Sequence, residues 1–380
     1  MPIFHRTELA EGLATRLLVV STVSAAGSGL FLAAPRRTGK STFLREDLRP
    51  ALQRHGALVI YADLWADQAA DPGDAIVNAI RAALAERESV ITRMARSSGL
   101  DKIAVGGLSF ALEKVGLAKG VTLSSALSAL SDETRQMIVL VIDEAQHAMT
   151  SEAGASALFA LKAARNELNS SSHHGLRIVA TGSNRDKLAM LRSSKDQAFF
   201  GAPLVNFPPL GKDYIEWFVS RLPFGKELDT AQVYQWFEEA AYRPEILGGA
   251  VDALTYDFEV RPGQHASRLH ELVKEQVQAS NEEALRVVHS LTPLQSAVLR
   301  VMATAGAAYA PFESQTMERY RDTLKRAAPE AKVEADTPNV QQALGALQDK
   351  ALVWKASRGV YALEDSFLAE LMRKEGLLDD

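Results

Sequence analysis

The sequence predicts an α/β protein with a parallel β-sheet in the N-terminal half of the chain and mostly helices after it. Short apolar runs alternate with helical patterns in the N-terminal half, and the runs lack a regular alternation of apolar and polar residues. Such runs are typical of strands that are covered on both faces, as in a parallel sheet. The five predicted strands are Leu30–Ala34, Leu58–Ala62, Met137–Ile142, Leu176–Thr181 and Pro203–Phe207.

Helices connect these strands, as the helical spacing of apolar residues indicates. They are predicted over Lys40–Arg54, Pro72–Met94 and Glu152–Leu168. Strands that alternate with helices favour a parallel sheet with helices on both faces. The segment Lys102–Lys114 differs, because apolar and polar residues alternate around Gly106-Gly107, and it predicts a β-hairpin insertion.

The rest of the chain, from Gly211 on, is predicted to be helical up to a C-terminal hairpin. Four helices are expected first, over Asp213–Leu222, Thr230–Ala241, Pro244–Tyr256 and His265–His289. Thr292-Pro293 marks a new helix start. After it come helices over Leu294–Ala305, Glu313–Ala328 and Asn339–Lys350, and then two short β runs over 352–363. That order is typical of a winged helix. We therefore predict three domains, over residues 1–210, 211–290 and 291–380.

Composition excludes several classes of protein. The chain has 380 residues, of which 47% are hydrophobic and 23% charged, so it is neither disordered nor collagen-like. Its net charge of −5 gives no overall basic surface for nucleic acid. The absence of cysteine excludes disulfides, thiolate zinc sites and iron–sulfur clusters, and it fits a cytoplasmic protein.

One uncharged stretch, Leu17–Pro35, is a candidate for a membrane span. Serine, threonine and glycine residues interrupt it, and it leads directly into a phosphate-loop pattern. A span needs about 20 predominantly apolar residues. We therefore interpret the stretch as a helix end, a turn and a buried strand, and we expect no membrane association.

The sharpest motif is a loop between the first predicted strand and the helix that follows it. Its residues are Ala34, Pro35, Arg36, Arg37, Thr38, Gly39, Lys40 and Ser41, followed by Thr42. They have Walker A spacing, with Ala34 in place of the first glycine, and the amides of such a loop bind phosphate. We expect Lys40 to bind the β- and γ-phosphates and the Ser41 hydroxyl to bind Mg²⁺. Ala34 costs little if its φ angle is negative and is strained if it is positive.

Two acids end the strongest predicted strand. Asp143 and Glu144 follow the apolar run 137–142, about 100 residues after the loop. In a parallel sheet the carboxyl ends of the strands meet at one edge. Asp143 is then expected to hold Mg²⁺ through water and Glu144 to polarise the attacking water. Acids at strand ends are also common as solvated turn residues, which is the alternative.

Two further polar positions are candidates for the same site. Asn184 follows the strand 176–181, and we expect it to orient the attacking water, with Ser183 as the second choice. Turn formation is the alternative for both. Arg243 precedes Pro244 at a predicted helix start and is a candidate for the γ-phosphate, or else a surface arginine.

Together these motifs resemble the AAA+/STAND superfamily, and especially the archaeal-type ATPases related to origin-recognition proteins. The matching segments are 34–41, Val-Ile-Asp-Glu-Ala-Gln at 141–146, Ala-Thr-Gly-Ser-Asn at 180–184, Tyr-Arg-Pro-Glu at 242–245 and Arg-Gly-Val-Tyr at 358–361. The resemblance spans most of the chain. It implies a P-loop NTPase sheet of order 5-1-4-3-2, a helical lid, a C-terminal winged helix and an adenine nucleotide. By it, Lys40, Ser41, Asp143, Glu144, Asn184 and Arg243 carry the roles given above.

The resemblance also implies an arginine finger from a neighbouring subunit or another domain. Arg185, Arg192 and Lys195 are candidates, and none stands out, so a homo-oligomer stays open.

The function expected is that of an ATPase that hydrolyses ATP with Mg²⁺ as a conformational switch coupled to the C-terminal domain. Two alternatives remain. One is an ATP-gated DNA-binding regulator with little turnover. The other is a signalling or defence-type NTPase that docks a protein partner, which the near-neutral charge of residues 285–380 favours.

Overall fold

The computed structural model describes residues 3–19, 27, 29–67, 69–87, 122–170, 173–193, 197–357 and 359–378. The predicted hairpin at 102–114, the end of the predicted helix at 88–94, Lys195 and Arg358 lie outside the described residues. The chain forms two compact units. The sheet unit comprises residues 5–33 and 41–206, and the helical unit comprises residues 1–4, 34–40 and 207–380.

The sheet unit contains a five-stranded parallel sheet of order β2-β3-β4-β1-β5. Its strands are β1 (Leu30–Ala33), β2 (Leu58–Asp63), β3 (Ile138–Asp143), β4 (Leu176–Gly182) and β5 (Leu204–Asn206). Read from the other edge, this is the predicted order 5-1-4-3-2, which is confirmed. Every residue of β3 and β4 is buried, which explains why their sequences are nearly continuous apolar runs.

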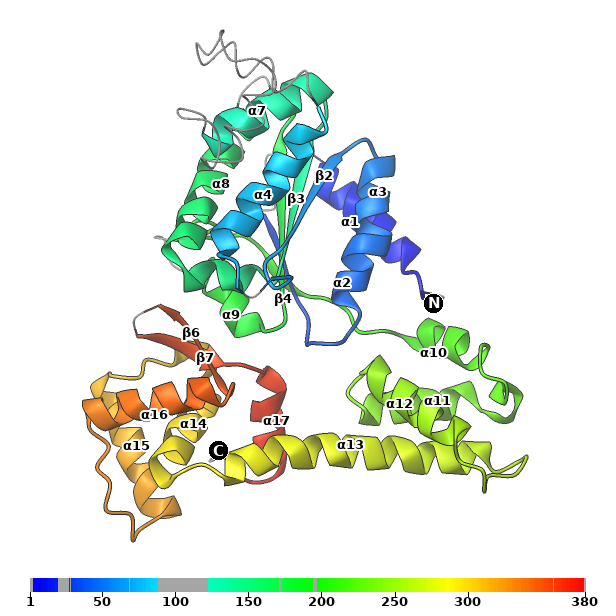
Figure 1. Ribbon diagram of the computed structural model, residues 1–380, viewed down its shortest axis with the longest axis vertical. Helices are drawn as coiled ribbons and strands as arrows, with labels where there is room; N and C mark the ends of the chain where they lie inside the picture. The colour runs from blue at the N-terminus through cyan, green and yellow to red at the C-terminus, as the bar shows by residue number, and fades with distance from the viewer. Residues whose placement is uncertain are drawn as a thin grey trace. The chain divides into compact units, whose positions relative to one another are not determined.

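Helices cover both faces of this sheet (Figure 1). On one side lie α4 (Pro72–Ala85), α7 (Leu123–Thr134) and α8 (Glu152–Ser170), and on the other lie α1 (Thr7–Leu18) and α3 (Arg49–Arg54). The short elements η3 (Ala145–Thr150) and α9 (Arg185–Ala189) follow β3 and β4. The apolar faces of β1, β3 and β4 pack with α4, α7 and α8 in one hydrophobic core.

The predicted helix 40–54 is present but is not one regular α-helix. It consists of α2 (Lys40–Thr42), the π-helical segment η2 (Phe43–Leu48) and α3. Such π-helical turns are frequent at functional sites. The apolar spacing of the sequence does not distinguish a π turn from an α turn, so the prediction missed it.

The helical unit holds two separate hydrophobic clusters. The first is built by α10 (Lys212–Val219), α11 (Thr230–Glu239), α12 (Pro244–Thr255) and the first part of α13 (His265–His289). The short element η4 (Gly225–Glu227) lies between α10 and α11 in the chain and has no buried residue. Asp229 caps α11 by accepting from Ala231 N, and Pro244 occupies the first turn of α12.

The second cluster lies between the C-terminal elements. These are α14 (Pro293–Ala305), η5 (Gly306–Ala308), α15 (Ser314–Ala327), α16 (Thr337–Asp349), the antiparallel hairpin β6 (Val353–Ser357) and β7 (Val360–Leu363), and α17 (Ser366–Lys374). Thr292 and Gln295 form a capping box at the start of α14. The three helices and the hairpin are as predicted, whereas α17 was not predicted.

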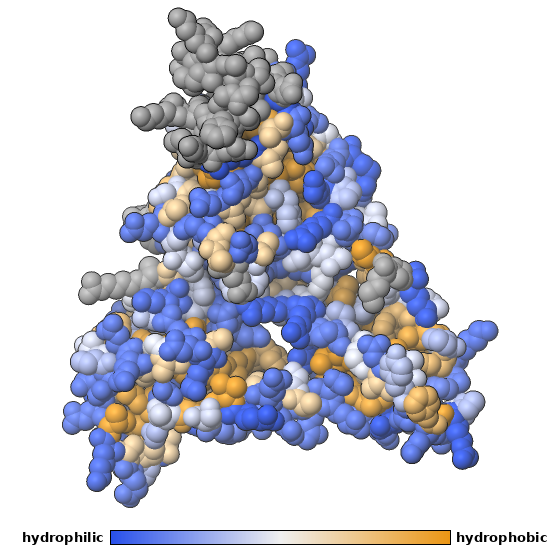
Figure 2. Space-filling model, viewed as in Figure 1, coloured by the Kyte–Doolittle hydropathy of each residue, from blue (hydrophilic) through white to orange (hydrophobic). Residues whose placement is uncertain are grey.

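The visible surface is mostly hydrophilic, with apolar side chains in small groups (Figure 2). In the part of the chain that the structure describes, no helix is both long and apolar enough to cross a membrane.

Candidate functional site

Three predicted motifs begin at the carboxyl edge of the parallel sheet. The loop 34–40 follows β1, the acids Asp143 and Glu144 end β3, and Ser183-Asn184 follows β4. Because β4 lies between β1 and β3, the ends of those two strands are about 10 Å apart, at about 4.8 Å per strand. That spacing is wide enough for phosphate groups and a hydrated metal ion.

The backbone of the loop 34–40 explains its residue choice. Gly39 has a φ angle of 81°, a backbone conformation that is strained for a residue with a side chain. Ala34 does not have a positive φ angle. Alanine in place of the first Walker A glycine therefore causes little backbone strain at position 34. Arg37 also has a positive φ angle, of 63°, so one of the two left-handed positions in this loop is held by a residue other than glycine.

Side chains of the loop are held at several points. The Thr38 hydroxyl donates to the Pro35 carbonyl oxygen at 2.8 Å. Lys40 is 6% exposed at the start of α2, and the next residue, Ser41, is exposed. Arg36 Nη2 donates to Glu364 Oε1 at 2.6 Å, a partner that is not predicted from the sequence.

Asp143 is a buried carboxylate with defined donors. It is 1% exposed, and its Oδ1 accepts from the Thr181 hydroxyl on β4 and from Glu144 N at 3.1 Å. Its Oδ2 accepts from the Tyr61 hydroxyl on β2 at 2.9 Å. A buried carboxylate needs such partners to remain charged. Sequence reasoning found Asp143 and missed both hydroxyl donors.

Glu144 has a left-handed backbone and an anchored side chain. Its φ angle is 53°, an unfavourable conformation for this residue type that recurs at functional sites. Its Oε2 accepts from Gln146 Nε2 at 2.6 Å, from Ser183 Oγ at 3.0 Å and from Ser183 N at 3.3 Å. The end of β4 therefore holds the second acid of the pair.

The two residues after β4 have different partners. Ser183, the second choice from the sequence, is the one that contacts Glu144. Asn184 is 2% exposed and its Oδ1 caps α9, accepting from Asp186 N at 2.8 Å and from Lys187 N at 3.2 Å. The role of Asn184 in orienting water stays a prediction, and its capping role is an additional one.

Two of the predicted arginines, Arg243 and Arg185, have hydrogen-bond partners within the protein. Arg243 lies in the helical unit, donates to Ser280 Oγ at 3.1 Å and stacks on the Phe367 ring at 5.2 Å. Arg185 donates to Asn206 Oδ1 at 2.6 Å. Arg192 follows α9 and is only partly exposed. The roles of these arginines toward a phosphate stay predictions.

Two further residues on the sheet unit were missed by sequence reasoning. Arg45 of η2 pairs with Asp63 at 2.6 Å, and its guanidinium lies 5.0 Å from the centroid of the Tyr61 ring. Burial, helped by the Asp143 carboxylate, raises the pKa of the Tyr61 phenol, so the hydroxyl stays protonated at neutral pH and can donate its hydrogen bond to Asp143. The signal in the sequence was weak, because Tyr61 is simply one residue of the apolar run Leu58–Ala62.

The donor set fits magnesium bound together with a nucleotide. Within the described residues, no cluster of three or more His, Asp or Glu could hold a metal ion by itself. Mg²⁺ is usually bound by one or two carboxylates, with water and phosphate oxygens as the other ligands. Asp143 and the Ser41 hydroxyl are oxygen ligands of that kind.

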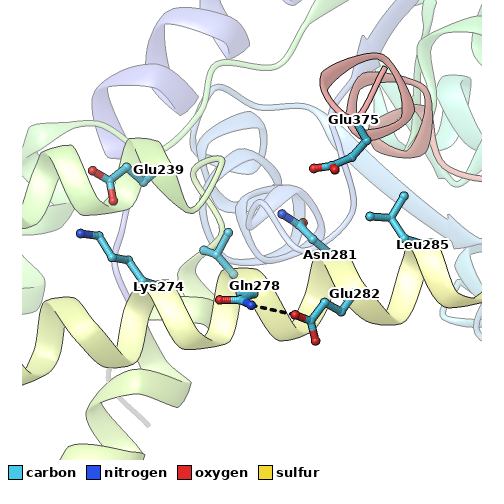
Figure 3. A pocket seen from close by; sticks show the side chains of 8 residues that line it. Glu239, Lys274, Gln278, Asn281, Glu282, Leu285 and Glu375 are labelled. Atoms are coloured by element: carbon cyan, nitrogen blue, oxygen red, sulfur yellow. Dashed lines mark hydrogen bonds between the residues drawn. The ribbon is translucent and has the colours of Figure 1, made fainter. Parts of the chain in front are cut away.

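A groove on the helical unit has a different chemistry (Figure 3). Lys274, Gln278, Asn281 and Glu282 of α13 line it together with Glu239 and Glu375. Gln278 Nε2 donates to Glu282 Oε1 at 2.7 Å. Three carboxylates against one ammonium group would repel a triphosphate, so this groove is not a candidate nucleotide site.

Comparison with solved structures supports the fold. The chain is similar to the Walker-type ATPase PABY2304 of Pyrococcus abyssi, with 20% identity, coverage of 98% of this chain and 96% of that chain, and a TM-score of 0.50. The ADP form of the Aeropyrum pernix ORC2 protein matches with 15% identity, coverage of 99% and 96%, and a TM-score of 0.48. No family model matches the chain, and no curated protein matches it significantly. The fold is that of P-loop ATPases, as the sequence motifs indicated.

Proposed function

We propose that this chain binds ATP with Mg²⁺ at the carboxyl edge of its sheet and hydrolyses it. The observation that carries the proposal is the acid pair Asp143 and Glu144 at the end of buried β3, two strands from β1 and the phosphate-loop sequence that follows it. Solvated turn acids are usually exposed, whereas Asp143 is 1% exposed and accepts from hydroxyls of two neighbouring strands. That arrangement supports a functional carboxylate rather than a turn.

The roles proposed for the residues follow from their chemistry. The amides of residues 34–40 and the N-terminus of the helix at Lys40 bind phosphate oxygens, and Lys40 neutralises the β- and γ-phosphates. Ser41 and Asp143 hold Mg²⁺, which neutralises charge on the phosphates when bound. Glu144 accepts a proton from the attacking water, and Ser183 and Gln146 fix the position of its carboxylate.

The first experiment measures ATP turnover and nucleotide affinity in the wild type, Glu144→Gln and Lys40→Ala. Loss of a general base typically costs about 10²- to 10⁴-fold in rate. We therefore expect Glu144→Gln to lose turnover by that factor and to retain ATP binding in calorimetry. We expect Lys40→Ala to lose binding, because it removes the charge at the phosphates.

Matched controls are available on the helical unit. Glu216→Gln and Lys226→Ala make the same chemical changes at exposed positions of α10 and η4, and both should behave as the wild type. Equal turnover in the wild type and Glu144→Gln would exclude Glu144 as the base. Wild-type protein that does not bind ATP with Mg²⁺ would exclude the function as a whole.

We further propose that residues 291–380 form a winged helix whose position depends on the nucleotide, and that it docks a protein rather than DNA. The observation that favours a protein is the composition of α16, the third helix, which presents Gln341 and Gln342 to solvent. Its range Thr337–Asp349 contains no lysine or arginine. Because phosphate contacts dominate affinity for DNA, such a helix is a poor DNA reader.

A titration with labelled duplex DNA at low salt, with and without an ATP analogue, tests this second proposal. Non-specific DNA binders have dissociation constants of about 10⁻⁴ to 10⁻⁶ M at physiological salt. We expect weaker binding than this range even at low salt. Submicromolar binding with a steep salt dependence that responds to the nucleotide would contradict it and favour the DNA-binding alternative.

A further inference from the structure

Asp143, on β3, is held by side chains of the two neighbouring strands. Thr181 on β4 donates to Oδ1 and Tyr61 on β2 donates to Oδ2 at 2.9 Å, so each carboxylate oxygen has a hydroxyl donor. With both oxygens engaged, rotation about the bond to the carboxyl group breaks at least one hydrogen bond. The orientation of the carboxylate is therefore set in part by Tyr61, a residue outside the recognised motifs.

Tyr61 is itself fixed from its other side. In the register of the sheet Tyr61 pairs with Val141 and Asp63 pairs with Asp143, so Tyr61 lies near the end of β2, close to the acid. The Arg45 guanidinium covers the Tyr61 ring at 5.0 Å and pairs with Asp63 at 2.6 Å. Arg45, Tyr61 and Asp143 thus form a continuous chain of contacts within the sheet unit.

This chain of contacts joins two elements that carry the proposed metal ligands. Arg45 lies on η2, which continues directly from the helix residues Lys40–Thr42 and hence from Ser41. Asp143 ends β3. A phenylalanine would fill the same space in β2 without binding the carboxylate. The hydroxyl is the part of Tyr61 that packing alone does not require.

We propose that Tyr61 is a positioning residue that orients Asp143 for the divalent metal, with Arg45 holding the Tyr61 ring. The inference rests on the proposed function, because it concerns the same metal site. Its consequence is specific: loss of the Tyr61 hydroxyl weakens binding of the metal to the nucleotide complex, and it leaves metal-free nucleotide binding unchanged.

The experiment compares the wild type with Tyr61→Phe in two binding measurements that do not depend on turnover. ADP affinity is measured by calorimetry in EDTA, and Mn²⁺ affinity of the ADP complex is measured by electron paramagnetic resonance. Loss of a group that orients a metal ligand typically costs about 10- to 100-fold in metal affinity. We expect a weakening of Mn²⁺ binding in that range and an equal ADP affinity in EDTA.

Two other variants separate positioning from stability. Arg45→Ala changes a side chain that is 48% exposed, so it opens no core cavity, and we expect a smaller loss of Mn²⁺ affinity in the same direction. Tyr256→Phe is the matched control, because Tyr256 is 75% exposed on the helical unit, and it should leave both affinities unchanged.

The outcomes are distinguishable. Wild-type Mn²⁺ affinity in both Tyr61→Phe and Arg45→Ala would overturn the positioning role and leave the proposed function standing. A wild-type protein that binds neither ADP nor Mn²⁺ with ADP would overturn both. An equal loss of ADP affinity with and without metal in Tyr61→Phe would also overturn the positioning role, because it would indicate general damage to the site.

Discussion

The substitution Gly182→Ala is expected to displace Gln146, which holds the Glu144 carboxylate, without changing a charged group. Gly182 ends β4, and a Cβ atom there would fall well inside contact distance of Gln146 Oε1 and 2.8 Å from Leu188 Cγ. Gln146 and Leu188 are both 0% exposed, so neither can move into solvent without rearrangement. Gln146 is also the residue that donates to Glu144 Oε2 at 2.6 Å.

The expected cost follows from these contacts. Overpacking of a core typically lowers the free energy of unfolding by about 1–3 kcal/mol. Loss of a hydrogen bond to a charged group typically lowers it by about 1.5–3 kcal/mol. Because displacement of Gln146 relieves part of the overlap, we expect the two losses to sum incompletely, to about 3 kcal/mol. For a unit of roughly 200 residues this lowers the melting temperature by about 6–12 °C.

The assay is thermal unfolding followed by circular dichroism, with Gly12→Ala as the matched control. Gly12 lies in α1 of the same unit, and a Cβ there meets nothing within 4 Å. Alanine is favoured over glycine in a helix by about 0.5–1 kcal/mol, so this variant should melt slightly higher than the wild type. A Gly182→Ala protein that melts with the wild type would refute the reasoning. So would the absence of coupling between Gly182→Ala and Gln146→Ala.

Three other outcomes are expected. Asn184→Ala should lower stability by about 1 kcal/mol in denaturant unfolding because it removes the α9 cap, whereas Asn184→Asp should keep the cap; equal stability of the two would contradict the capping role. Asp71→Ala should cost about 1 kcal/mol, because Asp71 Oδ1 caps α4 and accepts from the Ser151 hydroxyl, and no loss would exclude that cap. The hydrogen bond from Arg268 holds the pKa of Asp257 below its ordinary 3.8, so this stabilisation is present above that pH and lost as pH falls. Asp257→Asn should therefore have a lower melting temperature than the wild type at pH 7 and the same melting temperature at about pH 2. A difference in melting temperature that persists at the lower pH would contradict this.

The strands could be predicted from the sequence because a strand that is buried on both faces consists of a nearly continuous run of apolar residues. The run 137–142 predicts β3 to within one residue, and Leu58–Ala62 predicts β2 to within one residue. The helix His265–His289 was predicted at its observed bounds. Its amphipathic spacing over many turns leaves little ambiguity.

Other elements have less distinctive sequence patterns and were not predicted correctly. The helix α7 was not predicted, because its capping box uses Thr122 and Ser125 instead of the more recognisable pair with glutamate or glutamine. The helix α17 was also not predicted, and of α1 only the end, at the start of the stretch Leu17–Pro35, was predicted. The single helix predicted over 40–54 contains a π-helical segment, which depends on local hydrogen bonding that residue type does not reveal.

The two acids of the candidate site were predicted, whereas the side chains that hold their carboxylates in place were not. Asp143 and Glu144 could be predicted because they come directly at the end of a predicted strand. Tyr61 and Gln146 could not, because their roles depend on the register between β2 and β3 and on a left-handed turn at Glu144. Neither the pairing of strands nor the direction of a buried side chain can be read from one sequence.

The most direct test of the central claim is a crystal structure with a non-hydrolysable ATP analogue and Mg²⁺. We predict that the β- and γ-phosphates lie against the amides of residues 34–40, with Mg²⁺ bound between the phosphates, the Ser41 hydroxyl and Asp143, directly or through water. Density for the nucleotide away from the carboxyl edge of the sheet, or a metal ion remote from Asp143, would contradict the account.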